Sequence, residues 1–296
     1  MHNNNIHKNK YDFDQLIKNC EELTPFVFEN SYNTKTIDFS NPEAVKLLNK
    51  ALLSHHYELD YWEFPDENLC PPIPSRADYI HHLTDLLRRS SLGSDCKILD
   101  IGAGASCIYP LLGYAINNWS FVGTDIDARS LKIAQLIVDE NKLSNHIELR
   151  LQKNSDNILK GIVTLNDKFE ASICNPPFFR TEAEALEATK QKLKGLGNQN
   201  DKVVRNFSGT SKELTYKGGE KAFLHTYLYE STFYKTQFYW FTSLVSNVNH
   251  LKSMQTSLKK LGATMIEIIE MIQGNKISRI IAWSFLSKAE QKEWKT

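Results

Sequence analysis

The sequence lacks the features that mark secreted, membrane or zinc-binding proteins. Its five cysteines are scattered, none forms a Cys-x-x-Cys pair, and no His/Cys cluster has zinc-site spacing. Scattered cysteines of this kind are typical of reduced thiols in a cytosolic protein. The N-terminus has no apolar signal-peptide segment, and the longest strongly apolar stretch, 280–286, is too short to span a membrane. We therefore expect a cytoplasmic protein with no metal and no membrane association.

Net charge is also absent, because 35 Lys and Arg residues balance 35 Asp and Glu residues. The chain as a whole therefore lacks the basic excess of many nucleic-acid-binding proteins, and any such contact must come from local clusters. Its 296 residues, 41% apolar and 24% charged, are typical of a globular protein with one main domain and an appended segment.

Two regions differ in pattern. Residues 1–10 are rich in Asn, His and Lys, and we expect them to be mobile. The stretch that follows predicts helices near 12–20, 41–54 and 75–90, with Asn41 as an N-cap. From residue 97, strands alternate with helices, which favours a parallel sheet with helices on both faces. We expect a mainly helical extension over 1–95 and an α/β domain over 96–296.

Seven strands are predicted in the α/β region, at 97–101, 120–124, 147–151, 169–174, 237–244, 264–270 and 279–286. The last two are joined by a short link, which makes them an antiparallel hairpin. Five parallel strands followed by a hairpin resemble the Rossmann-like sheet of class I S-adenosylmethionine-dependent methyltransferases.

A glycine loop follows the first of these strands. Asp100-x-Gly102-x-Gly104 runs into Ser106 and a predicted helix. Glycine lets backbone N–H groups approach a ligand, and ligands bind at the carboxyl ends of strands in α/β sheets. The third glycine of the dinucleotide fingerprint is missing, since Cys107 occupies its place. This favours S-adenosylmethionine over NAD, with an ordinary tight turn as the structural alternative.

Asp125 ends the second predicted strand. A carboxylate at this point can accept hydrogen bonds from both ribose hydroxyls of a nucleoside cofactor. The alternative is an N-cap for the helix near residue 128, a role that Asp127 fills equally well.

The fourth strand leads directly into Asn175-Pro176-Pro177-Phe178. An adenine amine is a poor nucleophile, because its lone pair is delocalised into the ring. An Asn side-chain oxygen and a backbone carbonyl can each accept one amine hydrogen, while the prolines hold the backbone rigid. Phe178 offers a face on which a flipped base can stack. We therefore predict methyl transfer to the N6 amine of an adenine, the alternative being a Pro-Pro strand terminator.

Several segments resemble the bacterial 23S rRNA adenine-N6 methyltransferases of type F, which are related to METTL16-like RNA methyltransferases. The matching segments are 11–13, 36–39, 69–81, 100–106, 175–178 and 213–220. The resemblance implies methylation of A1618 in 23S rRNA, with the 1–95 extension contributing to RNA and cofactor binding. It implies that Arg76 binds the cofactor carboxylate, the alternative being a surface residue that caps the preceding loop. It also places Asn154 or Asp156 near the cofactor adenine. Phe179, Ser208 and Tyr216-Lys217 depart from the family pattern, which leaves the substrate contacts open.

Residues 190–212 form a basic, glycine-containing stretch after the catalytic strand. We expect Lys190, Lys194, Arg205 and Phe207 to bind RNA there, together with Phe178. The alternative is a solvated helix face followed by a linker. A second basic cluster at His2, His7, Lys8 and Lys10 suggests an N-terminal arm. The expected partner is 23S rRNA, either naked or within an assembling large subunit, bound by a monomer.

Two other functions fit parts of the pattern. The same tetrapeptide type serves other planar amines, in other RNAs, in DNA adenine or in a protein glutamine. A non-catalytic RNA-binding protein with a vestigial pocket is a third hypothesis. The presence of Gly102, Gly104, Asp125 and Asn175 together argues against it.

Overall fold

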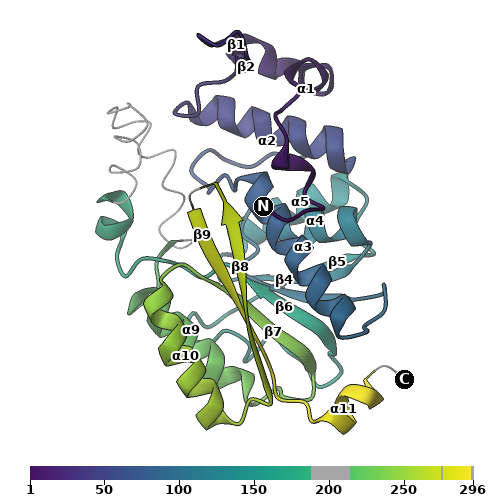
Figure 1. Ribbon diagram of the computed structural model, residues 1–296, viewed down its shortest axis with the longest axis vertical. Helices are drawn as coiled ribbons and strands as arrows, with labels where there is room; N and C mark the ends of the chain where they lie inside the picture. The colour runs from purple at the N-terminus through teal and green to yellow at the C-terminus, as the bar shows by residue number, and fades with distance from the viewer. Residues whose placement is uncertain (188–213, 275, 295–296) are drawn as a thin grey trace.

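The computed structural model describes residues 1–187, 214–274 and 276–294, and its centre is a seven-stranded sheet (Figure 1). The strands are β3 (Lys97–Ile101), β4 (Ser120–Asp125), β5 (Ile147–Leu151), β6 (Phe169–Cys174), β7 (Phe238–Val245), β8 (Met265–Gln273) and β9 (Lys276–Ser284). Their order is β5-β4-β3-β6-β7-β9-β8. The first five are parallel, and β9 pairs antiparallel with both β7 and β8. The predicted sheet and terminal hairpin are confirmed.

Both faces of the sheet are covered, which explains why its central strands are almost entirely apolar. Every residue of β7 is buried. Helices α3 (Ile73–Arg89), α4 (Ile108–Asn117) and α5 (Ala128–Glu140) pack on one face, and α9 (Gly219–Ser231) and α10 (Val248–Leu261) on the other (Figure 1). Alternate residues of each strand pack into the hydrophobic clusters on the two faces of the sheet. Ile98 and Phe121 belong to the cluster beneath α3, α4 and α5, and Leu99 and Val122 to the cluster beneath α9 and α10.

The N-terminal extension contains η1 (Ile6–Lys8), α1 (Phe13–Asn19), η2 (Glu21–Phe26) and α2 (Pro42–Tyr57). The predicted cap is confirmed, since the Asn41 side chain accepts from the backbone N–H groups of Glu43 and Ala44. A small hairpin of β1 (Phe28–Glu29) and β2 (Lys35–Thr36) was not predicted, because two-residue strands show no readable alternation. A short helix, α11 (Lys288–Glu293), ends the described chain.

The extension has no core of its own. Leu52, Trp62 and Tyr79 belong to the same hydrophobic cluster as Ile98 and Phe121 of the sheet. The division of the chain near residue 95 stays a prediction. No helix among the described residues is both long and apolar enough to cross a membrane.

The first ten residues pack against α2 and α3, so the prediction of a mobile N-terminal arm was wrong. Asn5 is fully buried, and its amide donates to the Pro74 carbonyl at 2.9 Å and to Asp78 Oδ1 at 3.0 Å. The His2 backbone N–H also donates to Asp78, at 2.7 Å. Polar composition suggested mobility, but these side chains find specific buried partners. Of the expected basic cluster, Lys8 and Lys10 remain exposed while His7 is buried.

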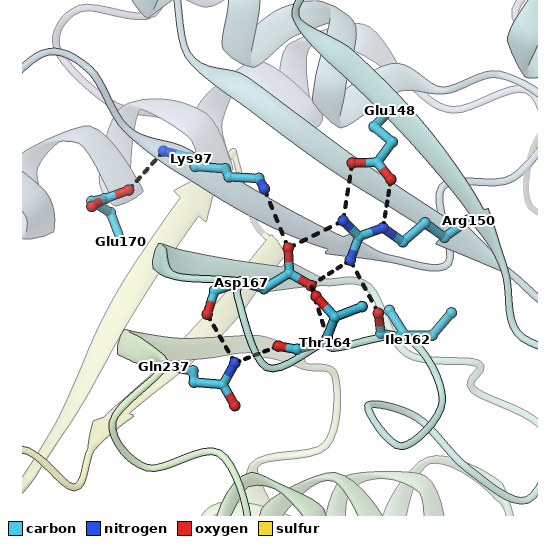
Figure 2. A network of polar contacts seen from close by, with 8 residues as sticks. All are labelled: Lys97, Glu148, Arg150, Ile162, Thr164, Asp167, Glu170 and Gln237. Atoms are coloured by element: carbon cyan, nitrogen blue, oxygen red, sulfur yellow. Dashed lines mark hydrogen bonds and ion pairs between the residues drawn. The ribbon is translucent and has the colours of Figure 1, made fainter.

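A charged network links Lys97 at the start of β3 and Asp167, just before β6, to Arg150 of β5 (Figure 2). The Arg150 guanidinium donates to both oxygens of Asp167, at 2.6 and 3.1 Å. Lys97 Nζ lies 3.3 Å from the same carboxylate, and the Thr164 backbone N–H donates to it at 2.8 Å. Burial alone would raise the pKa of Asp167. The hydrogen bonds from Arg150 and Thr164 instead hold it well below its usual range.

We predict that Asp167→Asn lowers the free energy of unfolding by about 3 kcal/mol at pH 7, because it leaves buried donors without a charged partner. The folded-state pKa of Asp167 is depressed, so its contribution is present above the unfolded pKa of about 3.9 and is lost as pH falls further. Urea unfolding at pH 7 and pH 3 should therefore show the difference from wild type shrinking in acid.

Asp66→Asn is the matched control, since Asp66 pairs with Lys46 in an exposed ion pair. It should cost less than about 1 kcal/mol. An Asp167 effect that is equally large at both pH values would contradict this account.

Candidate active site

Strand register brings the candidate residues together. Ile101 of β3 lies opposite Thr124 of β4 and Cys174 of β6. The next residues along each strand are Gly102, Asp125 and Asn175, which therefore emerge side by side at the carboxyl edge. All three line one cavity. Its wall also includes Arg76, Gly104, Ser106, Gln152, Asn157, Pro177 and Tyr216.

The glycine loop brings the backbone itself to the cavity wall. Gly102 and Gly104 have φ values of +82° and +62°, which L-residues with a side chain rarely adopt. The N–H groups of Gly102 and Ala103 both donate to the Thr124 carbonyl at 2.9 Å. Apart from its two chain neighbours, no described residue has an atom within 4 Å of the position that a Gly102 Cβ would take. A ligand can therefore approach the loop backbone closely.

Asp125 joins two parts of the cavity wall. Its carboxylate accepts the Gly104 N–H at 3.0 Å and the Asp127 N–H at 2.8 Å. Asp127 is the residue that caps α5, through the backbone N–H of Ser130. The alternative role of Asp125 as the helix cap is therefore wrong. A carboxylate has about four acceptor positions, so Asp125 can still accept from ribose hydroxyls.

The proline-rich segment before α3 forms another part of the wall. Leu69 and Pro71 line the cavity, and Arg76 reaches it from the first turn of α3. The Arg76 guanidinium lies 5.5 Å from the centre of the Tyr109 ring, a cation–π contact that holds it over α4. The fully buried Trp62 donates its indole N–H to the Ser106 carbonyl at 2.9 Å, which anchors this segment to the glycine loop.

Asn175 presents a buried acceptor to the cavity. Its Oδ1 atom has no hydrogen-bond partner among the residues that the structure describes. Buried polar atoms without partners are rare and costly, so this oxygen fits a site that receives a donor from a ligand. Pro177 lines the cavity and Pro176 is buried behind it. Phe178 is half-buried beside Phe179, at a ring-centre distance of 6.4 Å, and does not line the cavity itself.

Thr215 and Tyr216 complete this side of the cavity; sequence analysis placed them in a segment that matches the family, with Tyr216 as a departure, and assigned them no role. Phe179 and Thr215 form a parallel bridge, with the Tyr216 N–H donating to the Phe179 carbonyl at 3.0 Å. Thr215 and Tyr216 both line the cavity, and the Tyr216 ring packs edge-on against Phe223 at 5.2 Å. No periodicity marks this bridge, because the two segments are far apart in the sequence.

The loop after β5 lines the cavity through residues other than the expected Asn154. Asn154 is exposed, and its side chain accepts the Asp156 backbone N–H at 2.9 Å instead. Gln152, Ser155 and Asn157 face the cavity. The expected RNA contacts Lys190, Lys194, Arg205 and Phe207 lie outside the described residues.

Glu230 of α9 fixes this loop, a role that sequence analysis missed. Its buried carboxylate accepts the backbone N–H groups of Ile158, Leu159 and Lys160, at 2.7 to 3.1 Å. Ile158 itself lines the cavity. The carboxylate therefore holds one wall of the cavity from the far side of the loop.

We predict that Glu230→Ala weakens S-adenosylmethionine binding about tenfold, because the loop loses three charge-assisted hydrogen bonds. Calorimetric titration measures this affinity. Glu230→Gln retains one amide oxygen and should lie between the variant and wild type. Tyr229→Ala, a change at the exposed neighbour on the same helix, should leave affinity unchanged. Equal affinities for Glu230→Ala and wild type would contradict the positioning role.

The cavity suits S-adenosylmethionine on its own chemistry. It combines an accessible glycine backbone, the carboxylate of Asp125, the guanidinium of Arg76 and the buried acceptor of Asn175. No group of three or more His, Cys, Asp or Glu side chains that could hold a metal ion is found among the described residues.

Comparisons with known proteins agree with this site. A family model described as RNA methyltransferase matches residues 1–287. Ribosomal RNA large subunit methyltransferase F of Flavobacterium johnsoniae is 45% identical over 304 residues, covering 100% of this chain and 96% of the relative. The corresponding protein of Photobacterium profundum is 42% identical over 318 residues, covering 100% and 94%.

Two solved structures share the fold over almost the whole chain. The human METTL16 catalytic domain in complex with a MAT2A 3′UTR hairpin matches with a TM-score of 0.82 and 28% identity, covering 97% of this chain and 96% of that one. The N-terminal domain of human METTL16 in complex with SAH has a TM-score of 0.77 and 27% identity, covering 97% and 99%. This chain therefore belongs to the RNA methyltransferase family of the ribosomal RNA large subunit methyltransferases F, and is an S-adenosylmethionine-dependent enzyme with the class I fold.

Proposed function

We propose that this protein transfers a methyl group from S-adenosylmethionine to the N6 amine of A1618 in 23S rRNA. The observation that carries this proposal is the buried Oδ1 of Asn175, which has no hydrogen-bond partner in the described part of the chain and lies on the wall of the cavity formed with Gly102 and Asp125. The relatives named as ribosomal RNA large subunit methyltransferase F support the choice of RNA.

The bound cofactor supplies an electrophilic methyl group. Asn175 Oδ1 accepts one hydrogen of the target amine, and a backbone carbonyl of the tetrapeptide accepts the other. These two hydrogen bonds orient the amine and reduce the delocalisation of its lone pair into the ring. Pro176 and Pro177 each restrict φ to about −65°, so the acceptors are held in place before the base arrives. Positioning is therefore the main catalytic contribution of the tetrapeptide.

The target base must leave its stack to reach Asn175. Phe178 is half-buried beside the cavity and supplies an aromatic face for the flipped base. No strong general base is required, because the methylated amine is acidic enough to lose its proton to water.

RNA phosphates need cations around the opening. Lys153 and Lys217 are exposed next to the cavity-lining residues Gln152 and Tyr216, and exposed Arg180 follows the tetrapeptide segment. We assign phosphate contacts to these residues together with Lys190, Lys194 and Arg205, and a stacking contact to Phe207. The protein acts as a cytoplasmic monomer on 23S rRNA, either naked or within an assembling large subunit.

Asn175→Ala should lower kcat for methyl transfer to unmodified 23S rRNA by about 10²–10³-fold, because it removes one preorganised acceptor. Incorporation of labelled methyl groups into the RNA measures the rate. Asn175→Asp keeps an oxygen at this position and should retain far more activity than the alanine variant. Normal turnover by Asn175→Ala would show that this mechanism is wrong.

Arg76→Ala should weaken S-adenosylmethionine binding by about 10- to 100-fold, since it removes a charge-assisted contact to the cofactor carboxylate. RNA binding should change much less. Arg89→Ala is the matched control on the same helix, where Arg89 forms an exposed ion pair with Glu267. If both variants bound the cofactor equally well, Arg76 would have no part in the cofactor site.

A further inference from the structure

Asp100 is an unusual carboxylate beside the cofactor cavity. It lies on β3 directly before the cavity-lining residues Ile101 and Gly102, and is only 1% exposed. Neither of its carboxylate oxygens has a hydrogen-bond partner among the residues that the structure describes. Asp125, Asp167 and Glu230 differ in this respect, since each accepts backbone N–H groups. Asp100 therefore lacks the donors that normally stabilise a buried negative charge.

Its surroundings provide little compensation. The titratable groups that face it are Arg76 from α3, Cys107 and Tyr109 at the start of α4, Asp125 at the end of β4, and Cys174 of β6. Burial raises the pKa of the Tyr109 hydroxyl to about 12 and raises the pKa of each of the two thiols. These three groups are therefore neutral at pH 7.

Among the described residues, Asp125 and Arg76 bring charge to Asp100, and their effects on its pKa oppose each other. Burial raises the pKa of Asp100 well above its usual range, Asp125 raises it further, and Arg76 lowers it. The Arg76 guanidinium is itself held over the Tyr109 ring and is half-exposed, which limits its influence on Asp100. Because Asp100 is almost completely buried and neither oxygen accepts a hydrogen bond from a described residue, its surroundings favour the neutral carboxyl group over the carboxylate.

A cation bound in the cavity shifts the equilibrium between the neutral and ionised forms of Asp100 toward the ionised form. S-adenosylmethionine has one positive charge more than its demethylated product, because the sulfonium is lost on methyl transfer. An opposite charge within about 4–6 Å lowers a carboxyl pKa by about 1 to 3. The backbone of 101–104 lines the cavity and follows Asp100 directly, and Arg76 and Tyr109, which also line the cavity, face the Asp100 carboxyl group.

We propose that Asp100 couples cofactor binding to proton release: it is protonated in the cofactor-free protein and ionises when the positively charged cofactor binds. The Asp100 O–H bond breaks, its electron pair stays on the carboxylate, and the proton passes to solvent. After methyl transfer the cofactor charge is lost, and Asp100 takes a proton back from solvent. Asp100 thereby favours substrate cofactor over product, and favours it more as pH rises. This inference rests on the cofactor assignment, and it is independent of which nucleotide is methylated.

Calorimetric titration in two buffers of different ionisation enthalpy tests the coupling. Near neutral pH, S-adenosylmethionine should release up to one proton per bound molecule, and S-adenosylhomocysteine fewer. The Kd for S-adenosylmethionine should fall by up to tenfold from pH 6 to pH 7. Asp100→Asn, which keeps the shape without a titratable group, should abolish both effects.

Infrared difference spectra of the wild-type protein provide a measurement that needs no variant. Binding should remove a protonated-carboxyl band and add a carboxylate band. Binding of S-adenosylmethionine with no proton release and no loss of the carboxyl band would overturn the proposal while leaving the cofactor assignment intact. Absence of any binding heat would overturn the cofactor assignment and the proposal together.

Discussion

The parallel hydrogen-bond ladder through β4, β3 and β6 is the constraint on which the rest of the site depends. Because Ile101 pairs with Thr124 on one side and Cys174 on the other, three distant parts of the chain end at the same edge. The residues that follow them, Gly102, Asp125 and Asn175, therefore share one cavity. A slip of one residue in either pairing would turn the strand's side chains to the opposite face and separate the cofactor loop from the tetrapeptide.

Both faces of the sheet then contribute to the site. α3 brings Arg76 from one side, and Trp62 ties the preceding segment to the glycine loop. α9 acts from the other side through Glu230, which holds the loop after β5. The N-terminal extension shares a hydrophobic cluster with the sheet, so its packing and the shape of the cavity are linked. A substitution in this shared cluster therefore affects both the stability of the fold and the shape of the cofactor cavity.

Sequence patterns predicted the features that depend on local chemistry. Strand bounds at 97–101 and 169–174 follow from short apolar runs, and Gly102 is recognisable because only a special backbone conformation explains it there. Features that depend on residues far away in the sequence could not be predicted from sequence patterns. The burial of Asn5 depends on Asp78, and the position of the loop after β5 depends on Glu230 of α9. The isolation of Asp100 appears only once its neighbours are known, since an aspartate on a strand carries no mark of what surrounds it.

The central claim is that Asn175 and its neighbours direct a methyl group to one adenine amine in ribosomal RNA. The most direct measurement is mass-spectrometric mapping of unmodified 23S rRNA after incubation with the protein and isotopically labelled S-adenosylmethionine. The account predicts a single labelled N6-methyladenosine, at A1618. Label on another base type, at a different adenine, or only on protein would contradict it.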